Sequence, residues 1–341
     1  NLKAKKVFQV VFKGTAWTFL EKIVRVGSSF FVGIWMARYL GPERFGQYNF
    51  ALSIITISSV FVTLGLDRIL IKEFASKSIN KDILLGSGLW IKFTGSIIGY
   101  LLAIFICVLT PDTDTETRSL VLLMGLSYLF RLSECIEIWF QSELKLEIAA
   151  RAKLIALLIS SLIKCTLIFY EFSLISFGVI LTVEMAVISL FLTIAYVKTG
   201  ERLSFLSFRF DVVKSLISQS WPLLFSALSG ILYTQIDKLM IGANLGMKEL
   251  AFYAVYLQIM MIPRLFIASL NMSFSTMVSQ KYAAGDNGFW TFLTRVLTIN
   301  TWIAFLATIL LTVFGVPLIK VLFGNDFCYD SYALPMIIAI S

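Results

Sequence analysis

Long apolar runs, separated by short polar loops, occupy the chain almost from end to end. A helix of about 20 residues crosses the hydrocarbon core of a bilayer. Nine runs reach that length, and a tenth begins near Asp330 and is cut short at Ser341. The nine runs are 15–39, 46–66, 84–108, 119–140, 152–171, 174–197, 216–243, 250–270 and 290–315. We therefore expect ten membrane-spanning helices and an all-α fold, because the short alternating strands of a membrane barrel are not visible in the sequence.

The composition and the distribution of charge support a membrane protein. Hydrophobic residues make up 58% of the chain, against roughly 45–50% in soluble domains, which excludes a soluble protein. The net charge of +8 does not indicate nucleic acid, because Lys and Arg gather in every second loop rather than in one stripe. This alternation predicts a cytoplasmic N-terminus, with loops 67–83, 141–151 and 198–215 on the cytoplasmic side and 110–118 outside.

Several residue types and motifs that catalysis or cofactor binding commonly requires are missing from the sequence. The chain has no histidine, and its four cysteines form no Cys-x-x-Cys pair, so we expect no His-based catalysis, haem or metal site. No Gly-rich nucleotide loop ending in Lys-Ser/Thr is present, which argues against direct use of ATP. We expect no cofactor and no enzyme activity.

A nine-residue motif occurs twice, each time between one long apolar run and the next. Residues 40–48 read LGPERFGQY, and residues 245–253 read LGMKELAFY. An even number of spans separates the copies, which indicates parallel repeats. We expect two six-helix bundles related by a pseudo-twofold axis along the membrane normal. Residues 1–200 would form the first bundle and 201–341 about four spans of the second, its last two spans being absent from this chain.

Two blocks carry a resemblance to a known family. Residues 37–48, ARYLGPERFGQY, followed by Gly65-Leu66-Asp67, resemble the start of polysaccharide flippases of the Wzx type. So do residues 237–242, DKLMIG, which lead into Leu245-Gly246. These flippases belong to the multidrug, oligosaccharidyl-lipid and polysaccharide exporter superfamily. The resemblance covers essentially the whole chain and implies alternating access. It also implies movement of an undecaprenyl-pyrophosphate-linked oligosaccharide, such as an O-antigen unit of lipopolysaccharide, across the bacterial inner membrane.

Charged residues lie deep inside several predicted spans. An ionisable group near the bilayer centre costs at least ~2.5–3.5 kcal/mol, so it normally faces a cavity or a partner. The deep cations outnumber the deep carboxylates, which predicts an anionic ligand. Arginine suits phosphate because its planar fork donates two parallel hydrogen bonds. The candidate substrate ligands are Arg25, Arg131, Lys164 and Arg264, together with Lys22 and Lys92, which lie nearer to the cytoplasmic side.

Buried carboxylates are candidates for coupling transport to protons or sodium, as in an antiporter. They are Asp237, Glu21, Glu134 and Glu184. A structural interpretation stays open for two pairs at helical spacing, Glu21–Arg25 and Arg131–Glu134, which can hold helices together as ion pairs.

We expect a flippase with a cationic cavity for a lipid-linked oligosaccharide, in contact with membrane lipid and not with nucleic acid. Contact with the polysaccharide polymerase machinery stays open. The nearest alternative is a multidrug exporter on the same fold, which would line its cavity with carboxylates and aromatic rings. The alternative from another class is a membrane glycosyltransferase or polymerase. It would need acid–base carboxylates near one membrane face, and usually long outside loops.

Overall fold

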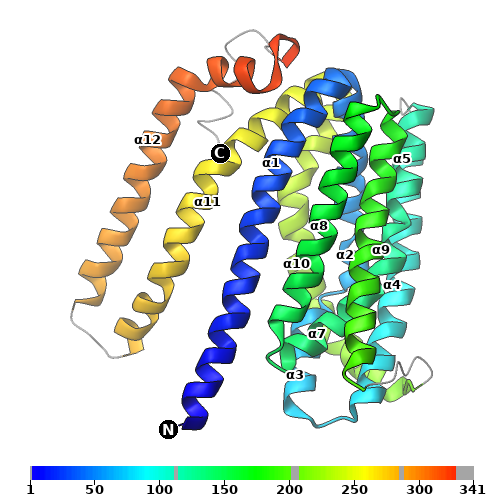
Figure 1. Cartoon of the computed structure of the whole chain (residues 1–341), viewed down its shortest axis with the longest axis vertical. Coiled ribbons are helices and arrows are strands. Elements are labelled where there is room, and N and C mark those ends of the chain that lie inside the picture. The colour runs from blue at the N-terminus through cyan, green and yellow to red at the C-terminus, as the bar shows by residue number, and fades with distance from the viewer. Residues whose placement is uncertain (1, 111–113, 201–206, 284–287, 328–341) are drawn as a thin grey trace. The chain divides into compact units, whose positions relative to one another are not determined.

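A computed structural model of the chain describes residues 2–110, 114–200, 207–283 and 288–327, and in these ranges it forms helices and no strand (Figure 1). The helices are α1 (Leu2–Ser58), α2 (Val60–Thr63), α3 (Leu66–Ser76), α4 (Lys81–Leu109), α5 (Thr115–Gly125), α6 (Ser127–Phe130), η1 (Arg131–Ser133), α7 (Glu134–Ser142), α8 (Leu146–Phe169), α9 (Leu174–Lys198), α10 (Phe210–Asn244), α11 (Met247–Ala283), α12 (Phe289–Phe323) and η2 (Asn325–Phe327). The predicted all-α fold is confirmed.

Seven helical stretches of the described chain are long and apolar enough to cross a membrane. The first stretch, Lys13–Ser76, contains the first two predicted spans. They are separated inside α1 by Gly41, which has a φ of 71° and precedes Pro42. Glycine adopts this conformation without steric cost, and proline supplies no amide hydrogen to continue the helix. The eighth predicted span lies within α11, and the tenth, near Asp330, lies outside the described residues.

The fourth predicted span, 119–140, is not one regular helix. The structure divides this range among α5, the single turn α6, the 3₁₀ turn η1 and α7. A 3₁₀ turn inside a longer helix often marks a functional hinge or a strained stretch of sequence. Here the irregular turn carries Arg131, and α7 begins at Glu134.

The two copies of the repeated motif share a backbone feature and contact one another. Gly41 in the first copy and Gly246 in the second are equivalent positions, and both have positive φ values, 71° and 110°. Gly46 of the first copy packs so tightly against the second that a Cβ atom there would lie 1.8 Å from the carbonyl oxygen of Met247. Each copy therefore ends one long helix and starts the next, and a side chain at position 46 has no space.

Contacts between residues divide the chain into two units, Asn1–Leu250 and Ala251–Ser341. Within the first unit, α10 packs against α1, α2, α3 and α4. The division into six-helix bundles near 200/201 stays a prediction.

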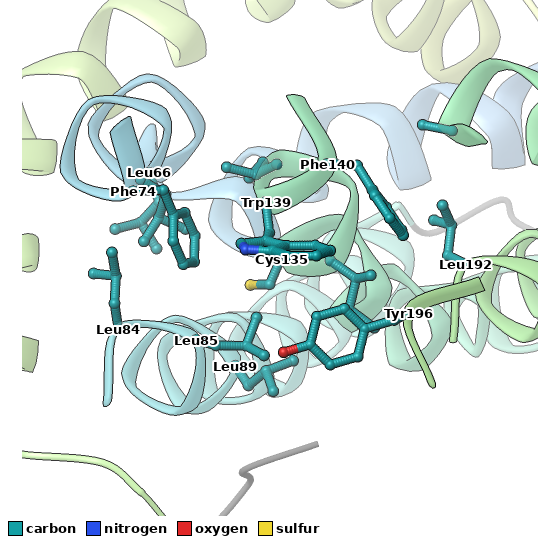
Figure 2. Close-up of a cluster of buried hydrophobic side chains, with 14 of the residues drawn as sticks. Leu66, Phe74, Leu84, Leu85, Leu89, Cys135, Trp139, Phe140, Leu192 and Tyr196 are labelled. Carbon is teal, nitrogen blue, oxygen red and sulfur yellow. The ribbon is translucent and has the colours of Figure 1, made fainter. Parts of the chain in front are cut away.

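A buried hydrophobic cluster fixes α7 against its neighbours in the first unit. Trp139 of α7 meets Tyr196 of α9 edge to face, with ring centroids 5.0 Å apart, and Leu85 and Leu89 of α4 belong to the same cluster (Figure 2). Because protein cores are close-packed, this cluster restrains α7. The polar residues at the start of α7 are thereby held in defined positions.

Candidate functional site

A cavity of about 470 Å³ lies among the helices of the first unit. Its wall is formed by α1, α6, η1, α7, α8 and α9, and it combines apolar residues with many charged and hydroxyl groups. The polar wall residues are Glu21, Lys22, Arg25, Thr56, Ser59, Ser127, Tyr128, Arg131, Ser133, Glu134, Glu137 and Lys153. A set of ionisable groups enclosed by membrane helices is typical of the path of a polar ligand or ion.

One charged cluster joins α1, α8 and α9, and we call it the Arg25 cluster: Glu21, Arg25, Ser160 and Glu184. Nε of Arg25 donates to Glu21 Oε1 at 2.6 Å, and Nη1 lies 3.3 Å from Glu184 Oε1. The Ser160 hydroxyl donates to the other oxygen of Glu184 at 2.8 Å. The two carboxylates are buried, whereas the Arg25 side chain is 37% exposed. One guanidinium therefore contacts two buried carboxylates.

A second charged cluster joins α3, α4, η1 and α7, and we call it the Lys92 cluster: Asp67, Lys92, Arg131 and Glu134. The Lys92 side chain is 0% exposed, and its Nζ lies 2.6 Å from Glu134 Oε2 and 3.0 Å from Asp67 Oδ1. Nε of Arg131 donates to the other Glu134 oxygen at 2.6 Å. One carboxylate therefore lies between two cations.

Two further polar features complete the wall of the cavity. Glu137 of α7 accepts hydrogen bonds from Lys153 of α8 and, at 3.2 Å, from Gln141. Lys22 is exposed and lines the cavity, and it makes no ion pair within the part of the chain that the structure describes. Lys22 is thus a cavity cation without a carboxylate partner in that part.

Three predicted site residues lie elsewhere. Lys164 is half-buried on α8 and does not line this cavity. Arg264 is exposed on α11 in the second unit. Asp237 is half-buried on α10, where its carboxylate accepts a hydrogen bond from the Lys238 amide at 2.9 Å. The roles predicted for these three residues stay predictions.

Four cations and three carboxylates line the cavity. The cations are Lys22, Arg25, Arg131 and Lys153, and the carboxylates are Glu21, Glu134 and Glu137. Lys92, Asp67 and Glu184 contact this wall from behind. The cation surplus and the anionic ligand that the sequence predicts stay predictions. The structural interpretation of the pairs Glu21–Arg25 and Arg131–Glu134 is confirmed as far as their contacts go.

Comparison with solved structures defines the class of fold. The chain is similar to a structure titled "Inward-facing conformation of a multidrug resistance MATE family transporter of the MOP superfamily", with a TM-score of 0.64. The similarity covers 92% of this chain and 76% of that one, at 16% sequence identity. At this identity the likeness shows the fold alone: the helical fold of a multi-pass membrane protein, like that of the MATE structure.

Comparison with protein families identifies the family of the chain. The chain belongs to the polysaccharide biosynthesis protein family, whose model matches residues 11–280. A search of curated proteins gives no match. The predicted family resemblance is confirmed, and the chain is a multi-pass membrane protein of the polysaccharide biosynthesis family with a MATE-like fold.

Proposed function

We propose that the protein is a flippase that moves an undecaprenyl-pyrophosphate-linked oligosaccharide, an O-antigen or similar repeat unit, across the bacterial inner membrane. The observation that carries the proposal is the match of residues 11–280 to the polysaccharide biosynthesis family. The charged cavity supports it, because a diphosphate needs cations along its path through hydrocarbon. The lipid tail stays in the bilayer while the polar head passes through the protein.

In this proposal Arg25 is the main diphosphate ligand, and Lys22 assists it. Arg25 is exposed to the cavity, and its guanidinium can present a planar fork to phosphate oxygens. Arg131 lines the same cavity, and Lys164 and Arg264 are proposed to contact the substrate elsewhere on its path. Lys92 is fully buried between two carboxylates, so its proposed role is to hold Glu134 in place.

Transport would occur by alternating access. Two six-helix bundles related by a pseudo-twofold axis along the membrane normal would rock about the connection 198–215, with the N-terminus on the cytoplasmic side. Carboxylates supply candidate sites for coupling to an ion gradient: Glu21, Glu134, Glu184 and Asp237.

A multidrug exporter remains the second candidate function. The observations that favour it are the MATE-like fold and the three carboxylates that line the cavity, Glu21, Glu134 and Glu137. The family match favours the flippase, since it names polysaccharide biosynthesis. A glycosyltransferase or polymerase is disfavoured by the transporter fold.

Transport by the purified protein in proteoliposomes separates these functions. We expect flipping of a fluorescent undecaprenyl-pyrophosphate glycan, measured with and without proton and sodium gradients, and no uptake of a cationic dye. Protein-free vesicles give the background rate. Dye transport without glycan flipping would replace the flippase with the multidrug exporter.

A further inference from the structure

The Arg25 cluster carries a net negative charge in a buried setting. Glu21 and Glu184 have side chains that are 8% and 6% exposed, and Arg25 is the cation that contacts both. The Ser160 hydroxyl donates a hydrogen bond to Glu184 at 2.8 Å but adds no charge. In the described part of the chain, Glu21 has no hydrogen-bond donor other than Arg25. The charge balance of this cluster therefore depends on a single guanidinium.

The other charged groups at the cavity do not replace that guanidinium. Those facing it are Lys22 of α1, Arg131 of η1, Glu134 and Glu137 of α7 and Lys153 of α8, and α6 contributes hydroxyl groups only. Arg131 and Lys153 already hold Glu134 and Glu137. Lys22 is exposed and neighbours Glu21 in sequence, but side chains at adjacent positions of a helix do not face each other.

An anion that enters the cavity competes with these carboxylates for Arg25. A diphosphate attracts the guanidinium through two parallel hydrogen bonds. Once Arg25 turns toward the diphosphate, Glu21 loses its charge partner and Glu184 keeps only the Ser160 hydroxyl. Two buried carboxylates beside a bound dianion are strongly unfavourable, and a proton on one of them relieves the repulsion.

Resting on the proposed function, we infer that binding of a diphosphate at Arg25 is coupled to uptake of a proton by the Glu21–Glu184 pair. Protonation of either carboxylate releases Arg25, and occupation of Arg25 favours protonation, so the two ligands bind together. In this step an O–H bond of a hydronium ion in the solvent breaks, and an O–H bond forms at a carboxylate oxygen, leaving water. An antiporter requires the proton and the substrate to exclude one another, whereas this cluster favours their joint occupation. The proton also lowers the negative charge that has to cross the hydrocarbon.

The test measures proton uptake when the purified protein binds undecaprenyl-pyrophosphoryl N-acetylglucosamine in detergent. This diphosphate diester has no oxygen that titrates near neutral pH, so a change in a pH-indicator dye reports protons bound by the protein. We expect uptake of up to about one proton per bound ligand, and an apparent affinity that rises by up to about tenfold for each unit that the pH falls. Glu21→Gln and Glu184→Gln should each reduce the uptake strongly and flatten the pH dependence.

A matched control is Glu147→Gln on α8, the helix that also carries Ser160. Glu147 also pairs with two cations, Lys13 and Arg151, but it does not line the cavity, so its variant should take up protons as the unmodified protein does. Binding of the ligand by the unmodified protein without proton uptake would overturn the inference and leave the flippase proposal intact. Uptake that persists in both cavity variants would also overturn it. Failure of the unmodified protein to bind this ligand at any pH would remove the proposed function and the inference together.

Discussion

The Arg25 cluster and the Lys92 cluster reach the same cavity, but they differ in charge balance and in the exposure of the shared cation. In the first, one guanidinium that is 37% exposed lies between two carboxylates. In the second, two cations alternate with two carboxylates, and Lys92, which lies between Asp67 and Glu134, is 0% exposed. A buried cation between two carboxylates cannot leave them without a large penalty. A partly exposed cation in the same position can turn toward an incoming anion. The comparison assigns Lys92 to structure and Arg25 to binding.

Loss of Lys92 should produce a large effect on stability. Lys92→Met leaves the carboxylates of Asp67 and Glu134 without their shared cation, which should lower the free energy of unfolding by about 3–5 kcal/mol. The midpoint of thermal unfolding in detergent measures this loss. The double variant Lys92→Met with Glu134→Gln should recover part of it. An unchanged midpoint in the single variant would show that Lys92 has no structural role.

Loss of Arg25 should lower the transport rate of the folded protein. Arg25→Ala removes charge-assisted hydrogen bonds worth about 1.5–3 kcal/mol, so the flipping rate should fall by about 10- to 100-fold. Arg25→Lys should restore part of the rate, because lysine keeps the charge but lacks the planar fork. The assay is glycan flipping in proteoliposomes, with equal amounts of reconstituted protein. Full activity of Arg25→Ala would remove the distinction between the two clusters.

A smaller effect is expected at Lys22. This residue lines the cavity but is exposed, and exposed charge pairs are worth about 1 kcal/mol or less. Lys22→Gln should therefore weaken binding of the diphosphate ligand by only a few-fold, with a normal unfolding midpoint. If Lys22→Gln weakened binding of this ligand as much as Arg25→Ala does, Lys22 would be the principal ligand.

The smallest effect is expected at the Lys13–Glu147 pair, which lies outside the cavity. Its atoms are 2.9 Å apart, but the Lys13 side chain is 60% exposed, and such pairs contribute ~0–1 kcal/mol. Lys13→Gln should leave both flipping and the unfolding midpoint within experimental error of the unmodified protein. A clear loss of either property would mean that this exposed ion pair matters as much as those in the cavity.

The features that could be predicted from the sequence depend on local spacing. The apolar runs indicated where the helices lie, and pairs three or four residues apart, Glu21–Arg25 and Arg131–Glu134, could be proposed because one helix face brings them together. Contacts between helices could not be predicted. Lys92 pairs with Asp67 and Glu134, which are 25 and 42 residues away, and no pattern in one sequence encodes which helix faces meet. The 3₁₀ turn that carries Arg131 was missed for a related reason, since an apolar run does not reveal a local change in helix geometry.

The central claim is that the cavity of the first unit binds the diphosphate through Arg25. A structure of the protein with bound undecaprenyl-pyrophosphoryl N-acetylglucosamine tests it most directly. We expect diphosphate oxygens within about 3 Å of the Arg25 guanidinium, the contact between Arg25 and Glu21 broken, and the Lys92 cluster unchanged. A diphosphate bound outside this cavity, with Arg25 still contacting Glu21 and Glu184, would contradict the account.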